Sequence, residues 1–362
     1  MKLKMKALSL AVATIAAGTA AHAADVAMFP YVVNSPTVAT LVSIVDTGAA
    51  DDGYTVGGVP GGSRLHWRLN YKAGANASTN SAICEEVNYF LPSSQNDIQT
   101  VDIGGNFGGT TKGVLFNDAS INNDWDANTT ATINYMLGKA AGVQRGVLFV
   151  HNSNSDGVLN PGAPVGQTIY GEAMILDISA GAAWGYQAAL RDNGGVNTAA
   201  AFDFSLAATN AAGSAPDILT FMPLAETTTR VFVTPVNSLA ATPLLGVDGS
   251  SAANWDRHTA RVGLVTGTGV AYDRDENLVS GTTLSNVTCV GFVDVGDLMT
   301  AGAKAVLANG GWGTLSIQQG TGAAATSFNV NTAVATKLEY NTSGNLNGQG
   351  VGGTFNNGFI MR

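Results

Sequence analysis

Strict alternation of apolar and polar side chains over residues 64–72 is the strongest constraint on the fold. Leu65, Trp67, Leu69 and Tyr71 fall on one face, while His, Arg, Asn and Lys residues fall on the other. Successive side chains of a β-strand point to opposite faces of the sheet. The pattern therefore predicts a half-buried antiparallel strand whose polar face meets solvent.

Further segments have the length and composition of strands. Residues 37–46 are apolar on both faces, which indicates a strand in the centre of a sheet. Clusters of Gly, Asn, Asp and Pro separate the segments, as expected for turns. The remaining predicted strands are residues 113–116, 146–151, 168–179, 230–234, 260–266, 288–294, 314–318 and 336–340.

Helical patterns are few. Residues 297–309 carry an apolar stripe at helical spacing, Asp294 or Asp297 is available to cap the start, and Gly310 follows the end. Residues 130–141 give a weaker helical pattern. We therefore expect one or two short helices.

Many short strands and little helix predict an all-β fold, a mostly antiparallel β-sandwich or jelly-roll-like arrangement. Residues 24–362 are expected to form a single large β-rich domain. Residues 193–216 are rich in Ala, Gly and Asn and form either a long surface loop or a sub-domain break. We favour the loop, because the two cysteines lie on opposite sides of this segment.

The first 23 residues have the organisation of a secretory signal peptide. A basic start with three lysines precedes an apolar run over residues 7–17, and the small-residue triplet 21–23 ends the segment. The sequence therefore predicts cleavage after about Ala23 and a location in the periplasm, at the cell surface or outside the cell.

Charge argues against nucleic acid as a partner, and hydropathy argues against a membrane-spanning helix. Removing the three lysines of the signal peptide takes the formal net charge from −9 to about −12. An acidic chain repels phosphate backbones, so we expect no nucleic-acid partner. After residue 23 no apolar run approaches the roughly 18 residues that a membrane-spanning helix needs.

The only two cysteines are Cys84 and Cys289. In an exported protein a pair predicts a disulfide, and this one would close a loop of roughly 200 residues. The chain-entropy model assigns such a loop about 4 to 5 kcal/mol. The alternative is two buried free thiols.

Catalytic patterns are scarce. No Gly-x-Ser-x-Gly elbow occurs, and the histidines after residue 23, His66, His151 and His258, lack metal-ligand spacing. Glycoside hydrolysis needs two carboxylates flanking a cleft. Glu172, which interrupts an apolar strand face, and Glu86 are the weak candidates, with a solvated position or a salt bridge as the alternative for each.

Two loops are weak calcium candidates. Asn152, Asn154 and Asp156 match the opening of a calcium loop, but position 12 of that loop is Ala. Asp273 and Asp275 form a second acidic cluster. The alternative in both places is an Asx-rich turn that bonds its own backbone. We expect no other cofactor.

The predicted mature N-terminus is apolar and β-prone. Phe29, Tyr31 and Val33 would line such a strand, and Pro30 limits it to an edge position. An exposed strand of this kind can pair with a neighbouring copy and build a homo-oligomer or filament. The alternative is a strand within its own sheet.

These patterns favour an exported, non-catalytic structural or adhesive protein. The runner-up is a secreted glycan-binding protein or glycan-active hydrolase, for which five scattered tryptophans offer rings that stack on sugars.

Overall fold

The computed structural model describes part of the 362-residue chain, and every structural statement below concerns that part. The described residues are 26–47, 55–56, 59–60, 63–93, 96–107, 113–117, 125–127, 132–133, 142–153, 169–179, 181–191, 204, 217–236, 259–264, 271–319, 333–341, 344–346, 349–350 and 355–361. Over this range no helix combines the length and apolar character needed to cross a membrane.

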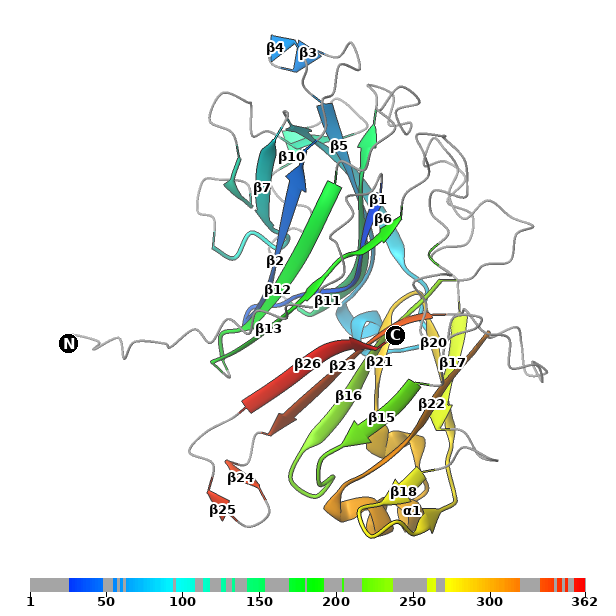
Figure 1. The fold of residues 1–362 in the computed structure, drawn as a ribbon. Helices are drawn as coiled ribbons and strands as arrows, with labels where there is room; N and C mark the ends of the chain where they lie inside the picture. The colour runs from blue at the N-terminus through cyan, green and yellow to red at the C-terminus, as the bar shows by residue number, and fades with distance from the viewer. Residues whose placement is uncertain are drawn as a thin grey trace.

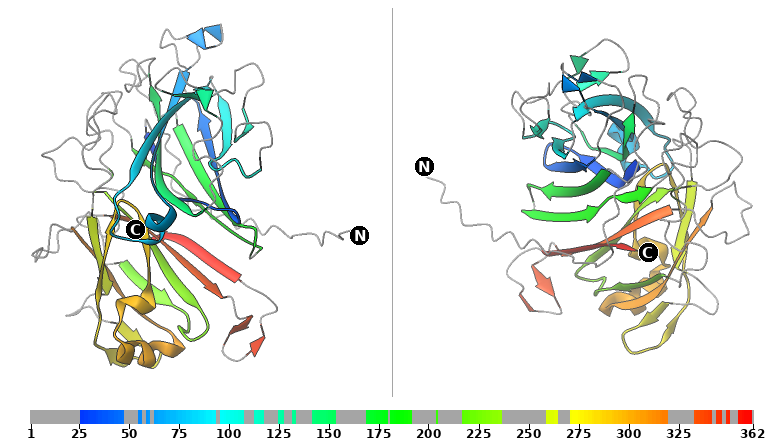
Figure 2. Two further views of the ribbon diagram at one scale, coloured as in Figure 1. Left: turned by 180° about the vertical axis from the view of Figure 1, so that it is seen from behind. Right: turned by 45° about the horizontal axis from the view of Figure 1, so that its top comes forward.

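The fold is built from antiparallel β-sheets, which confirms the predicted all-β, sandwich-like class. Two halves are stacked on one another, with the N-terminal half in the upper part of Figure 1 and the C-terminal half below it. Figure 2 shows the same division from two further directions. Each half contains two facing sheets with apolar side chains between them.

The N-terminal half contains a seven-stranded and a five-stranded sheet. In spatial order the seven-stranded sheet consists of β10 (Thr132–Ile133), β9 (Trp125–Ala127), β6 (Glu85–Ser93), β5 (Ser63–Ala73), β11 (Gln144–Ser153), β1 (Val26–Asn34) and β14 (Ala189–Arg191). The five-stranded sheet consists of β13 (Ala182–Gln187), β12 (Ile169–Asp177), β2 (Val38–Asp46), β7 (Asp97–Asp102) and β8 (Val114–Phe116). The predicted central strand is thus β2, which lies between β12 and β7.

The C-terminal half contains a six-stranded and a four-stranded sheet. The six-stranded sheet consists of β19 (Leu278–Val279), β18 (Ala271–Asp273), β22 (Gly311–Gln319), β17 (Thr259–Leu264), β20 (Leu284–Thr288) and β15 (Asp217–Phe221), which pairs with β22. The four-stranded sheet consists of β21 (Gly291–Asp294), β16 (Thr228–Pro235), β23 (Ala333–Asn341) and β26 (Phe355–Met361). Two small ribbons pair β3 (Thr55–Val56) with β4 (Val59–Pro60), and β24 (Asn345–Leu346) with β25 (Gln349–Gly350).

The two strands β16 and β23 of the four-stranded sheet are buried on both faces and join the two halves. Val231 and Val233 of β16 belong to the core of the C-terminal half. Phe232, between them, and Leu338 of β23 belong to the core that includes the N-terminal sheets. This explains why β16 is apolar at successive positions instead of alternating.

β1 pairs with β11 along most of its length, whereas β14 pairs only with its first three residues, Val26–Met28. Among the described residues Pro30 therefore has a strand on one side only, as expected for an edge, whereas the start of β1 lies inside the sheet. Pro30 is accommodated at a shift of register between Phe29 and Val32, where the ladder with β11 is interrupted. A bulge is one of the sheet positions that tolerate a residue without an N–H group.

The predicted helix is shorter than expected. η5 (Val295–Leu298) is a 3-10 turn that includes Asp297, and α1 (Ala301–Val306) follows, continued by η6 (Leu307–Asn309). The N-cap is Thr300, whose hydroxyl accepts from the Ala303 N–H at 3.4 Å, and not Asp294 or Asp297. Gly310 ends the segment with a φ of 93°, as predicted.

Two other predicted segments are only partly covered. Of the weak helix over residues 130–141, only residues 132–133 are described, and they form β10. The proposed loop or break at 193–216 lies outside the described residues apart from Phe204, which packs on Phe149 of β11 with ring centroids 5.8 Å apart.

Candidate functional site

The polar face of β5 is buried. His66, Arg68, Asn70 and Lys72 are each 6% exposed or less. The expectation that this face meets solvent is therefore wrong, although the alternation itself is present. Four buried polar side chains on one strand need partners, and these partners define the most polar site in the described part of the N-terminal half.

A hydrogen-bonded chain runs across this face from β5 to β6. His66 Nε2 and Asn88 Oδ1 are 3.0 Å apart, and Asn88 Nδ2 donates to Glu86 Oε1 at 2.6 Å. The other oxygen of Glu86 binds the Arg68 guanidinium at 2.5 Å. Glu86 thus occupies a salt bridge, which is the alternative to a catalytic role.

The structure brings together two of the three histidines that follow residue 23. His66 and His151 are directly opposite on β5 and β11, with ring centroids 4.6 Å apart. The spacing of the two histidines along the sequence did not reveal the pair. They are 85 positions apart, and only the pairing of β5 with β11 makes them neighbours. The described residues contain no group of three or more His, Cys, Asp or Glu side chains arranged to hold a metal ion, and His258 lies outside them.

Asn70 differs from its neighbours. Within the described chain, neither the amide nitrogen nor the oxygen of this fully buried side chain has a hydrogen-bond partner. Leaving a buried polar group unpaired costs about 1 to 3 kcal/mol. Asn70 is therefore a destabilising position on the polar face.

Lys72 joins the polar face to the C-terminal half. Its ammonium donates to the carbonyl oxygens of Thr79, Asn80 and Val290 at 3.1, 3.2 and 2.8 Å. Burial, assisted by the charge of Arg145, lowers the pKa of Lys72 to about 8. Val290 lies in the turn between β20 and β21, so this contact crosses between the halves.

The same turn carries the predicted disulfide. Cys84, just before β6, is bonded to Cys289, which confirms the expected pairing. Beside it, Asn80 donates from Nδ2 to the Phe292 carbonyl at 2.6 Å, and its Oδ1 accepts from the Phe292 N–H at 3.2 Å. We call the disulfide, Lys72 and Asn80 the clasp, because together they fasten the β5–β6 connection to the β20–β21 turn.

Aromatic rings and an arginine fill the contact between the halves next to the clasp. The ring centroid of Phe232 on β16 lies 4.0 Å from that of Tyr31 on β1. The Phe232 ring also stacks on Trp184 of β13, with centroids 5.2 Å apart. The Arg230 guanidinium lies 3.9 Å from the Phe292 ring centroid and forms two hydrogen bonds to Asp294, at 2.6 and 2.9 Å. The contact between the halves is thus aromatic, and the ion pair next to it lies within the four-stranded sheet of the C-terminal half.

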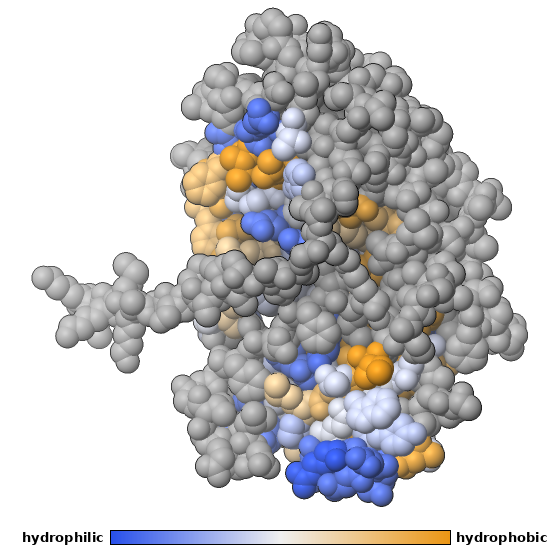
Figure 3. All heavy atoms as spheres, in the orientation of Figure 1, coloured by the Kyte–Doolittle hydropathy of each residue, from blue (hydrophilic) through white to orange (hydrophobic). Residues whose placement is uncertain are grey.

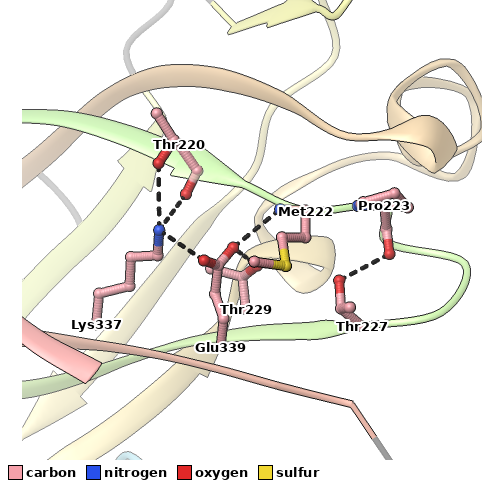
Figure 4. Close-up of polar contacts among 7 residues, drawn as sticks. All are labelled: Thr220, Met222, Pro223, Thr227, Thr229, Lys337 and Glu339. Carbon is pink, nitrogen blue, oxygen red and sulfur yellow. Dashed lines mark hydrogen bonds and ion pairs between the residues drawn. The ribbon is translucent and has the colours of Figure 1, made fainter. Parts of the chain in front are cut away.

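A second buried ion pair lies within the C-terminal half (Figure 4). Lys337 and Glu339 of β23 have side chains exposed by 1% and 4%, and Nζ lies 3.0 Å from Oε2. Sequence reasoning missed this pair. The available signal was two charged residues two positions apart in an otherwise apolar strand, which reads as a solvent-facing pattern.

Glu172 lies on β12 and is exposed. Its neighbours across the sheet are Ser43 on β2 and Gln187 on β13. Glu172 thus occupies a solvated position, which is the alternative to a catalytic role, because the apolar face that it interrupts is the outer face of the sheet. Glu86 lies on the other sheet, so the structure does not place the two candidates on one strand pair.

The calcium candidates are placed only in part. Asn154 and Asp156 lie outside the described residues, and so does the side chain of Asn152. The Asp273 carboxylate accepts from the N–H groups of Asp275 and Asn277 at 2.9 and 2.8 Å. The hydrogen bond from the Asn277 side chain, together with these backbone bonds, lowers the pKa of Asp273. The second loop thus contains the Asx turn that was the alternative.

The residues expected to drive assembly are inside the protein. Phe29 and Tyr31 are buried, and Val33 is half-buried opposite Arg145 of β11. Exchanging this strand with another copy would require β1 to leave β11.

Large apolar side chains are exposed on the outer face of the six-stranded sheet. Trp312 of β22 stacks on Tyr272 of β18 with ring centroids 4.7 Å apart, and Leu278 lies opposite Tyr272. Figure 3 shows hydrophobic and hydrophilic side chains side by side on the lower half of the molecule.

Comparison with protein-family models, curated proteins and solved structures finds no match to this chain.

Proposed function

We propose that the protein is an exported structural or adhesive component of the cell surface or extracellular matrix, in which two β-sandwiches act as one rigid body. The observation that supports this proposal is the clasp. The Cys84–Cys289 disulfide fastens the two halves at one place. Beside it, the Lys72 ammonium donates to the Val290 carbonyl as well as to two carbonyls of its own half, and the Asn80 side chain forms two hydrogen bonds with the Phe292 backbone. Such a joint suits a module that bears load or presents a surface outside the cell, where disulfides persist.

Location is the first test. Intact cells are treated with a protease that cannot enter them, and the protein is followed by antibody together with the redox state of Cys84 and Cys289. We expect surface-accessible or released protein with an oxidised pair. Protein retained in the cytoplasm with two free thiols would refute the proposal.

Adhesion or matrix integrity is the second test. A strain lacking the protein is complemented with the parent chain or with the C84A/C289A variant. We expect the parent to restore attachment and the variant to restore less at equal surface abundance. Equal attachment with and without the protein would remove the adhesive role.

Self-assembly through β1 is a separate part of the proposal. Ala27 and Val150 are directly opposite on β1 and β11, so an A27C/V150C disulfide would lock β1 into its own sheet. If copies exchange this strand, the oxidised variant stays monomeric while its reduced form assembles like the parent. Assembly that persists in the locked form would refute strand exchange.

The alternative is a glycan-binding protein or glycan-active hydrolase. Trp312, 37% exposed beside Tyr272, and the exposed Glu172 are the observations in its favour. A glycan array with the W312A variant tests binding, and hydrolysis by E172Q tests catalysis. Unchanged binding and unchanged hydrolysis in the two variants would exclude these residues.

A further inference from the structure

β15 is an edge strand of the six-stranded sheet. It pairs with β22 from Asp217 opposite Leu315 to Phe221 opposite Gly311, and β22 is its only strand partner in the described chain. An edge strand presents unpaired N–H and C=O groups that another chain can use as a template. Ile218 of this strand is also 60% exposed, which makes the edge more attractive to an apolar strand.

Two side chains of the opposite sheet bond backbone groups of this edge (Figure 4). Lys337 Nζ donates to the Thr220 carbonyl at 2.6 Å and to its hydroxyl oxygen at 3.3 Å. Glu339 Oε1 accepts from the Met222 N–H at 2.9 Å. Thr220 lies in β15, and Met222 is the first residue after the strand. Residues two apart in an extended chain direct their backbone groups to the same side, so both bonds lie on the side where the next strand would pair.

The pair is held in place from its own sheet. The Thr229 hydroxyl on β16 donates to Glu339 Oε1 at 3.0 Å, and Thr229 is directly opposite Glu339 in the ladder. Replacing a buried ion pair with apolar side chains of similar size is often neutral or stabilising. Stability alone therefore gives no reason for two charges in this core. A reason is their position, because they place a donor and an acceptor against the open edge of β15.

We propose that Lys337 and Glu339 occupy the pairing edge of β15 and prevent a strand from a second copy of this chain from extending the six-stranded sheet. The side-chain ammonium substitutes for the N–H of the missing strand, and the carboxylate substitutes for its C=O. This inference concerns an edge far along the chain from β1 and is independent of the proposed cellular role.

The test is the oligomeric state of a K337M/E339L variant, measured by size-exclusion chromatography with light scattering over a range of concentrations. These side chains keep approximate volume and remove both edge contacts. We expect a twofold mass that appears with increasing concentration. E339Q is the matched control, because its amide oxygen still accepts from the Met222 N–H and Lys337 remains, and we expect it to elute like the parent.

Two further variants complete the test. Adding I218K to the double variant places a charge on the exposed edge, which disfavours strand pairing, and should restore the parent mass. K337M/E339Q frees only the Thr220 carbonyl, because the amide oxygen at position 339 still accepts from the Met222 N–H. It replaces K337M/E339L if that variant does not fold, and it should associate more weakly than K337M/E339L. If K337M/E339L, or K337M/E339Q in its place, folds but keeps the parent mass at every concentration, the proposal is overturned. Association that I218K leaves unchanged would overturn it as well.

Discussion

Removal of the Cys84–Cys289 bond should cost a large share of the stability of this protein. The bond joins residues 205 positions apart. In the chain-entropy model, closing a loop of that length lowers the entropy of the unfolded chain and so raises its free energy by about 5 kcal/mol. Native proteins of this kind have a total free energy of unfolding of about 5 to 15 kcal/mol. The C84A/C289A variant should therefore fold only marginally.

Urea unfolding followed by far-UV circular dichroism and tryptophan fluorescence measures the loss. The parent in a reducing agent provides the control, and its free energy of unfolding should approach that of the double variant. The slope of the free energy against urea should rise as well, because the unfolded chain without the cross-link exposes more surface. Both probes should report one transition in the parent.

If the double variant loses less than about 1 kcal/mol, the cross-link does not act through the unfolded chain as the model states. If the two probes separate in the variant, Lys72 and Asn80 alone do not hold the halves together. Coincident probes with a large loss would show that the noncovalent clasp still couples them.

Three other substitutions test particular contacts. The pKa of Lys72 is about 8 in the folded protein and 10.5 when free, so the unfolded state binds more protons between these values; the free energy of unfolding should rise from pH 8 to 10.5, and K72M should lack that rise. N70L removes the unpaired carboxamide and should stabilise the protein by about 1 to 3 kcal/mol in urea unfolding; a loss instead would mean that Asn70 binds ordered water. A Cβ on Gly171 would lie 2.5 Å from Phe29 Cζ, so G171A should cost about 1 to 3 kcal/mol, and an unchanged urea midpoint would contradict that packing.

The sequence predicted several of the long strands, because alternation and turn residues are local signals. β11, β16 and β23 contain the segments predicted for them, and β2 lacks only the first residue of 37–46, whereas β6, β7 and β15 were not predicted. The prediction failed where the answer depends on what covers a strand. Alternation over β5 shows that its two faces differ, but it cannot show that other parts of the protein bury the polar one.

The candidate site was harder to predict from the sequence for the same reason. The His66–His151 pair and the Lys337–Glu339 contact with β15 depend on strand order, which no local pattern encodes. Pro30 illustrates the reverse case. A strand with proline is expected at an edge, and among the described residues Pro30 has a strand on one side only, where a bulge lets the ladder with β11 continue before and after it. The cysteine pairing was predictable because only two cysteines are present.

The position of β1 has a consequence for the order of folding in time. The first described strand has as neighbours β11 and β14, which end at residues 153 and 191. A chain emerging from its N-terminus cannot complete this sheet until more than half of it has appeared. The partner of Cys84 emerges later still, at residue 289. For a chain exported while unfolded, the first strand would wait, unpaired, for segments from the middle of the chain, and the first thiol would wait longer, for Cys289.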